Sequence, residues 1–162
     1  MISPILGELR RMYEGNAWHG PSVLDALRGV TAAQAAARPV AGAHTIHELT
    51  HHMAAWIGEV NSRLRGNRAG SPADGDFPPP ATPLDEATWS AVLANLSRRH
   101  MELMETVAAF DESRLADPVD PAEPPDEQHP RTFHALIQGL VQHNAYHAGQ
   151  VMLLRRAIER SE

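Results

Sequence analysis

The chain has 162 residues and no cysteine, and 43% of its residues are hydrophobic while 21% are charged. This length and balance predict one soluble globular domain over residues 1–162 and argue against a disordered chain. The net charge is −6, and the scattered arginines, which are the only positive residues besides histidine, indicate no nucleic-acid partner. The absence of cysteine and lysine excludes disulfides, thiolate metal ligands and Schiff-base catalysis.

The apolar runs of the sequence are too short to span a bilayer, so we expect no membrane partner. The first residues, MISPILGELRRM, include acidic and basic side chains where a signal peptide would need an apolar stretch. A cytoplasmic protein is therefore expected.

The first quarter of the chain predicts three helical segments. Residues 2–14 are amphipathic, and Gly15 and Asn16 break the pattern. The segment SVLDALRGV follows, with Pro21 suited to its first turn. Thr31 and Gln34 then form a capping-box pattern that opens a short helix before Pro39.

Two long helices follow. Thr45 and Glu48 form a second capping-box pattern, and the helix that they open runs to about Arg65. Residues 66–84 are a proline-rich connection, and the stretch TPLD at its end is expected to open the next helix, with proline at the first position and an acid in the first turn. That helix runs through WSAVLANLSRRHMELMETVAAF.

The last helix is predicted from about residue 132 to 160, after an acidic, proline-rich connection over residues 111–130. No convincing alternation of apolar and polar residues predicts a strand. Four long amphipathic helices in a chain of this size predict an all-α four-helix bundle with long proline-rich connections.

The last predicted helix carries two histidines within its apolar face. With His143 set at zero and 100° per residue, His147 falls at about 40°, Gln150 at about −20°, Leu136 at about 20° and Leu140 at about 60°. The i,i+4 spacing puts the Cβ atoms of the two histidines roughly 5–6 Å apart, so both rings can reach one ion. The alternative is a pair of core histidines bonded to polar neighbours or water.

The helix predicted over residues 45–65 supplies a third imidazole. With His52 at zero, Trp56 falls at about 40° and Leu49 at about 60°, so His52 faces the core. His51 falls at about −100°, near the edge of the apolar stripe, and is expected beside the ligands rather than among them.

His52, His143 and His147 therefore form a predicted site for one divalent transition metal ion per chain, since neutral imidazole is the commonest protein ligand for such metals. Three ligands leave coordination positions open for water and substrate, as in catalytic sites. A closed structural site needs a fourth ligand, for which Gln150 and Glu48 are the nearest candidates, although Glu48 already has a capping role.

Two other motifs compete with this set. Residues 47–51 match H-E-x-x-H, a zinc-protease pattern, but His47 and His51 are expected away from the apolar face, and no edge strand is predicted to hold a peptide. Glu48 and His51 also match the E-x-x-H element of di-iron proteins. That design needs carboxylates from all four helices, and the acid nearest His143 and His147 is Glu159.

Three segments together resemble the DinB-like (YfiT-like) metalloenzyme superfamily: AWHGPSVLDALRGV, HTIHELTHHMAAW and HALIQGLVQHNAYHAGQVMLLRR. The resemblance implies an up-down-down-up bundle, with His52, His143 and His147 as metal ligands. It also implies zinc or nickel as the metal, a homodimer, and a small-molecule substrate. Relatives include transferases that use low-molecular-weight thiols, such as mycothiol, bacillithiol or glutathione, and hydrolases.

We expect the ion to act as a Lewis acid that activates a thiol or a water molecule. Gln150 is expected to orient a ligand, to bond to a metal-bound water, or to make a polar contact in the core. Tyr146 is expected either to border the pocket or to pack as an ordinary side chain, and Trp18 and His19 are candidates for the mouth of the site. Trp56 and Trp89 are expected in the core. The alternatives are a non-catalytic metal- or ligand-binding bundle and a helical protein that satisfies its histidines without metal.

Overall fold

The computed structural model describes residues 2–68, 70–77, 84–122 and 131–160. Within these residues the regular structure is helical apart from an isolated bridge between Pro118 and Thr132, so the prediction of an all-α protein is confirmed. The elements are α1 (Ile2–Glu14), α2 (Val23–Leu27), α3 (Ala32–Ala36), α4 (Ile46–Leu64), α5 (Glu86–Ala108), the 3₁₀ helix η1 (Glu112–Ala116) and α6 (Phe133–Glu159).

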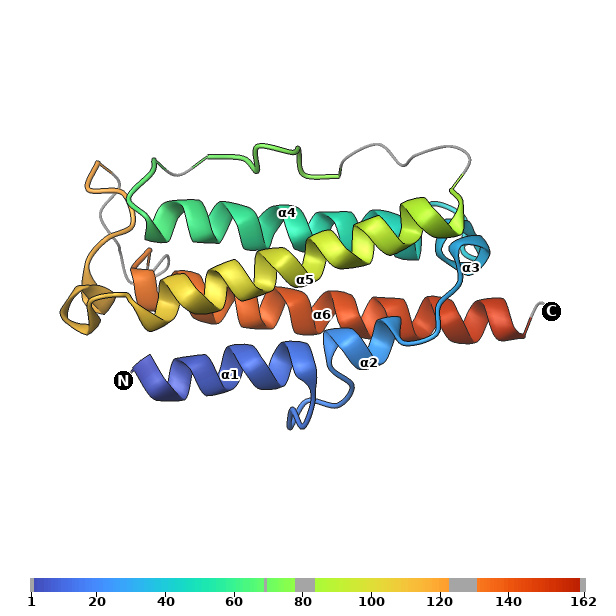
Figure 1. The fold of residues 1–162 in the computed structure, drawn as a ribbon, viewed down its shortest axis with the longest axis horizontal. Coiled ribbons are helices and arrows are strands. Elements are labelled where there is room, and N and C mark those ends of the chain that lie inside the picture. The colour runs from blue at the N-terminus through green and yellow to red at the C-terminus, as the bar shows by residue number, and fades with distance from the viewer. Residues whose placement is uncertain (1, 69, 78–83, 123–130, 161–162) are drawn as a thin grey trace.

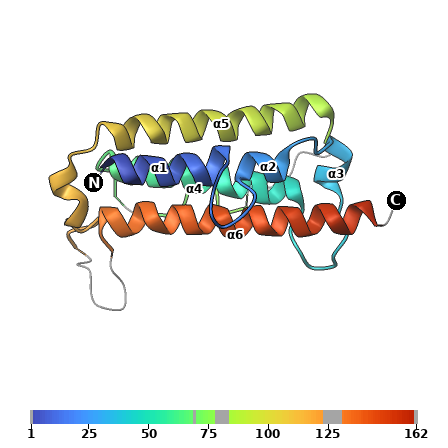
Figure 2. The same cartoon turned by 90° about the horizontal axis from the view of Figure 1, so that it is seen from below.

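The four long helices lie lengthwise beside one another in both views (Figures 1 and 2). In Figure 1, α1 and α6 run from left to right, whereas α4 and α5 run from right to left. Helix α4 packs against both α5 and α6, and α1 packs against the same two helices. No helix among the described residues has the length and apolarity that crossing a bilayer requires.

The N-terminal ends of the helices are set by short-range side-chain caps. Both predicted capping boxes are present, Thr31 with Gln34 and Thr45 with Glu48. A third box joins Ser22 and Asp25, so α2 begins after Ser22 and Pro21 lies outside the helix rather than in its first turn. In each box the cap oxygen accepts a backbone N–H that has no partner within the helix.

Helix α5 begins later than the sequence pattern suggests. Asp85 is its N-cap, and the Asp85 carboxylate accepts the backbone N–H of Thr88 at 2.7 Å. A carboxylate at this position also interacts favourably with the helix dipole. The expected helical start at Pro83 lies outside the described residues, and Leu84 precedes the cap.

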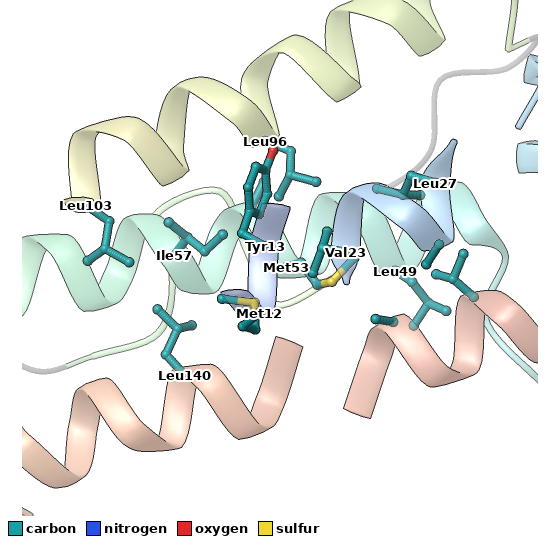
Figure 3. Close-up of a cluster of buried hydrophobic side chains, with 14 of the residues drawn as sticks. Met12, Tyr13, Val23, Leu27, Leu49, Met53, Ile57, Leu96, Leu103 and Leu140 are labelled. Carbon is teal, nitrogen blue, oxygen red and sulfur yellow. The ribbon is translucent and has the colours of Figure 1, made fainter. Parts of the chain in front are cut away.

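The hydrophobic core lies between the long helices, and Figure 3 shows one part of it. Trp89 is buried there as predicted, and its indole N–H donates to the carbonyl of Val30 at 2.7 Å. The labelled members of the cluster come from α1, α2, α4, α5 and α6: Met12, Tyr13, Val23, Leu27, Leu49, Met53, Ile57, Leu96, Leu103 and Leu140.

The expectation that His47 faces away from the apolar interior is wrong. Its side chain is 1% exposed and lies edge-to-face against Trp89 of α5, with ring centroids 6.2 Å apart. A helical wheel centred on His52 describes only the face of α4 that meets α6. Because α5 covers a second face, α4 buries residues around most of its circumference.

Candidate metal centre

The structure brings His52, His143 and His147 together between α4 and α6. The ring centroid of His52 lies 4.8 Å from that of His143 and 4.7 Å from that of His147. The centroids of the two α6 rings are 4.5 Å apart. One nitrogen from each ring can be chosen so that all three lie within 4.8 Å of one another. Among the described residues, no other group of three or more histidines and carboxylates meets this criterion.

Each of the three rings has an oxygen beside its Nδ1 atom. His52 Nδ1 lies 2.7 Å from the backbone carbonyl of Asp76, and His147 Nδ1 lies 2.6 Å from Oε1 of Gln150. His143 Nδ1 lies 3.1 Å from Oδ1 of Asn144. A carbonyl oxygen can only accept a hydrogen bond, so these contacts place the imidazole hydrogen on Nδ1 of each ring.

The remaining nitrogens then present lone pairs to the space between the helices. His52 Nε2 and His143 Nε2 are only 2.9 Å apart, and two lone pairs at that separation repel unless a cation lies between them. Metal–imidazole bonds of 2.0–2.1 Å in a tetrahedral site require nitrogen separations of roughly 3.3 Å. Because the candidate nitrogens lie within 4.8 Å of one another, the three side chains fit a transition metal ion once ring rotations bring the nitrogens to the separation that a tetrahedral site requires.

Burial favours the neutral, ligating form of the two α6 histidines. Burial lowers the pKa of His147 to about 4, although the hydrogen bond to Gln150 acts in the opposite direction. Burial likewise lowers the pKa of His143, with an opposing contribution from the bond to Asn144. A neutral imidazole is the form that binds metal, so neither ring has to lose a proton near neutral pH.

The loop that follows α4 supplies two contacts that the sequence analysis did not identify. Asp76 accepts from His52 through its backbone, and its carboxylate accepts the indole N–H of Trp56 at 2.7 Å. Phe77 lies between two parallel imidazoles, with centroids 4.1 Å from His52 and 3.7 Å from His44. The sequence offers one signal for these contacts: an acidic and an aromatic residue stand together just before a proline run. Such a pair in a loop is a candidate for a functional role, because loops often carry functional residues.

Trp56 was expected in the core, but it is half-buried and lines a pocket beside the three histidines. Gln150 holds His147 through Oε1, and its Nε2 donates to the hydroxyl of Tyr146 at 3.0 Å. Tyr146 is 64% exposed and borders the same pocket. Gln150 and Tyr146 thus form a chain of hydrogen bonds that ends on His147.

Glu48 and His51 are not members of the candidate metal group among the described residues. Glu48 closes the capping box of α4 and pairs with Arg38 at 2.7 Å. His51 packs edge-to-face on His47, with ring centroids 4.7 Å apart. These two histidines of the H-E-x-x-H sequence form a pair, and the candidate metal group among the described residues does not include them.

Trp18 and His19 occupy the loop between α1 and α2. Trp18 is fully exposed, and both residues line a separate depression of about 240 Å³ next to Val141. The pocket beside the histidines is lined by other residues. Sequence spacing alone does not determine the path of this loop, which turns at Gly15 (φ 141°) and Asn16 (φ 61°).

Two cavities meet the candidate metal centre at His147. The first has a volume of about 560 Å³ and includes Trp56, Phe77 and Leu140 among its lining residues. The second, of about 370 Å³, includes His44 and Gln150. His147 and Tyr146 line both, so molecules in the two cavities could meet at the same imidazole.

Comparison with known proteins agrees with this geometry. A sequence model of the DinB superfamily matches residues 17–151, which include the three histidines and the residues beside their Nδ1 atoms. No curated protein and no solved structure gives a significant match. Because the match covers most of the chain, the protein belongs to the DinB superfamily.

Proposed function

We propose that the protein is a metal-dependent enzyme that activates a thiol or a water molecule for attack on an electrophilic small molecule. The observation that carries the proposal is the convergence of three imidazoles, each with its Nδ1 directed at an oxygen, and with the Nε2 atoms of His52 and His143 directed at each other. The open pocket beside them argues for catalysis over a closed structural site.

His52, His143 and His147 would hold one divalent ion, with zinc or nickel as the proposed metal. Such an ion, when bound, supplies Lewis acidity that lowers the pKa of a thiol or water molecule. Three neutral ligands leave its full positive charge in place. The fixed Nδ1 contacts keep the rings oriented, which reduces the reorganisation needed for binding.

The protein's own groups would position the reactants. Gln150 donates to the Tyr146 oxygen, which leaves the Tyr146 hydroxyl hydrogen available for an oxygen atom of the substrate. The apolar walls of the larger cavity would exclude water around that contact and strengthen it. The smaller cavity, which Tyr146 also lines, offers room for a second reactant.

The proposed reaction can take two forms, thiol transfer and hydrolysis. In thiol transfer, the thiol loses its proton, its sulfur bonds to an electrophilic carbon, and the leaving group departs with the bonding electrons and takes up a proton. In hydrolysis, the oxygen of water bonds to the carbonyl carbon of an ester or amide, and the alcohol or amine leaves protonated. The two cavities favour the two-substrate version, thiol transfer.

The extent of the domain, the bundle topology and the assembly are part of the same proposal. We take residues 1–162 as one domain with the up-down-down-up bundle topology, and a homodimer as the assembly. The directions of α1, α4, α5 and α6 in Figure 1 support that topology. Measurement of mass in solution tests the assembly.

Metal content tests the site directly. The chain, purified without a histidine tag and loaded with zinc or nickel, should bind one ion per chain, and His143→Ala should lose it. His134→Ala is the matched control, because His134 is an exposed histidine on the same helix. Equal metal content in the wild type and His143→Ala would refute the three-histidine site.

Activity tests the chemistry. Metal-loaded protein should conjugate mycothiol, bacillithiol or glutathione to monochlorobimane, or hydrolyse 4-nitrophenyl acetate, and the metal-stripped protein and His143→Ala should do neither. Thiol transfer without hydrolysis supports the two-substrate version. Inactivity in both assays, with one ion bound, would leave a metal-binding bundle and overturn the proposed catalysis.

A further inference from the structure

The larger cavity follows α4 and α6 away from the three histidines. On α4 it is lined by His52, Trp56 and Val60, which are spaced four residues apart and so share one face. On the antiparallel helix α6 it continues from His143 through Gly139 to Ala135, again at intervals of four. Eight residues of helix rise about 12 Å, so the cavity is a groove two turns long that starts at the candidate metal centre.

The far part of this groove has apolar walls. Val60, Ala135, Leu136 and Leu140 line it. Asp76, the one carboxylate that the described residues contribute to the lining, accepts the indole N–H of Trp56 near the histidines. A charged group placed in the far part would lose its hydration without gaining a partner from these described residues. A volume of about 560 Å³ suits a small molecule, and these walls favour an uncharged hydrocarbon portion.

Gly139 leaves space in the groove, and this space is not needed for close packing of the helices. It lies within α6, where glycine is less favourable than alanine by about 1 kcal/mol. A Cβ atom at Gly139 would meet no atom of the described residues within 4 Å, so none of these neighbours demands a glycine. Since Gly139 lines the groove, the space beside it is available to a ligand.

We propose that this groove binds the hydrocarbon tail of the substrate, with its reactive end at the three histidines, and that Gly139 determines how large a tail fits. The inference rests on the proposed function for the position of the reactive end. The substrate class is therefore an electrophile at the end of an apolar alkyl or aryl chain about 12 Å long or shorter.

The chain offers a matched pair of glycines for the test. Gly139→Leu puts a side chain into the groove, whereas Gly149→Leu makes the same change on α6 at an exposed position outside the lining of both cavities adjoining the histidines. A Cβ at Gly149 also meets nothing within 4 Å. Both variants should therefore fold and bind one metal ion, which circular dichroism and metal analysis check.

Acetohydroxamic and octanohydroxamic acids are the probes, because both carry the same metal-binding head. Calorimetry with zinc-loaded protein should show that affinity rises by up to about fourfold for each added methylene group. Gly139→Leu should lower the affinity for octanohydroxamic acid by at least about tenfold, which corresponds to the burial of two methylene groups. The affinity for acetohydroxamic acid should be unchanged. Gly149→Leu should bind both like the wild type.

A metal-independent arm separates this inference from the proposed function. In metal-free protein, 1-octanol should change the tryptophan fluorescence through Trp56, and Gly139→Leu should weaken that binding. If the chain takes up no metal but binds 1-octanol in this way, the proposed function fails and the groove stands. Equal affinity for short and long probes, or wild-type binding of the long probes by Gly139→Leu, would overturn the groove assignment.

Discussion

The phenyl ring of Phe77 lies parallel to the imidazole of His52, with centroids 4.1 Å apart and 6° between the ring planes. The loop that carries Phe77 also provides the Asp76 carbonyl that accepts from His52 Nδ1. One ring is thus fixed by a stacking contact on its face and a hydrogen bond at its edge. The candidate ligand from α4 owes its orientation to a segment about 25 residues further along the chain.

Phe77→Leu should weaken metal binding without abolishing it. The substitution keeps an apolar side chain but removes the stack on His52, and aromatic contacts contribute about 0.5–1.5 kcal/mol beyond the area that they bury. We expect the metal dissociation constant to rise by about two- to twelvefold, as measured by competition with a chelating dye. Phe110→Leu is the control, because Phe110 packs on Phe133 instead. Equal losses in the two variants would mean that the stack has no specific role.

Gln150→Ala should reduce metal affinity by about 10–100-fold, the range typical of groups that orient a histidine ligand. The amide oxygen of Gln150 holds Nδ1 of His147 at 2.6 Å. Gln150→Glu keeps an acceptor at this position and should restore most of the affinity. Gln142→Ala, an exposed change on the same helix, should bind metal like the wild type. Wild-type affinity in Gln150→Ala would remove Gln150 from the site.

Acid should destabilise the fold through His100, which lies apart from the candidate metal centre on α5. His100 is 2% exposed and stacks on Tyr13 at 3.9 Å, and its two ring nitrogens have no hydrogen-bond partner among the described residues. Burial, assisted by the positive charge of Arg10, lowers its pKa from 6.5 to about 4.

The sign of the effect follows from proton binding. Between these two pKa values the unfolded chain binds a proton at His100 and the folded chain does not, so the free energy of unfolding falls as pH falls. The contribution is complete above about pH 6.5 and decreases by up to about 3 kcal/mol as the pH approaches 4. His100→Phe, which keeps a ring against Tyr13, should flatten this part of the pH profile in urea denaturation of the metal-free protein. Parallel profiles for the two proteins would contradict the assignment.

Thr45→Ala should lower the free energy of unfolding by about 1 kcal/mol, because it removes the cap of α4. The hydroxyl of Thr45 accepts the backbone N–H of Glu48 at 3.1 Å, and the carboxylate of Glu48 accepts the backbone N–H of Thr45 at 2.7 Å. Thr45→Ser retains the oxygen and should recover most of the loss in denaturant melts. A loss as large in Thr45→Ser would point to packing of the threonine methyl instead.

The local features of the chain were predictable from its residues. The caps at Thr31 and Thr45 depend on contacts only three residues apart, and the helical period brings His143 and His147 to one face. The same period favoured His52 over His51 as the residue that faces the core, and His52 does lie there, beside both α6 histidines. The caps and the face on which each histidine lies need only the geometry of one helix.

Features that depend on two or more elements required the tertiary structure. His47 is buried because α5 covers a second face of α4, which a single apolar stripe does not reveal. The contacts of Phe77 with His52 and the groove beside Gly139 arise where segments distant in the sequence meet. Periodicity assigns a residue to a face of its own helix, but only packing between elements decides what that face meets and where space remains for a ligand.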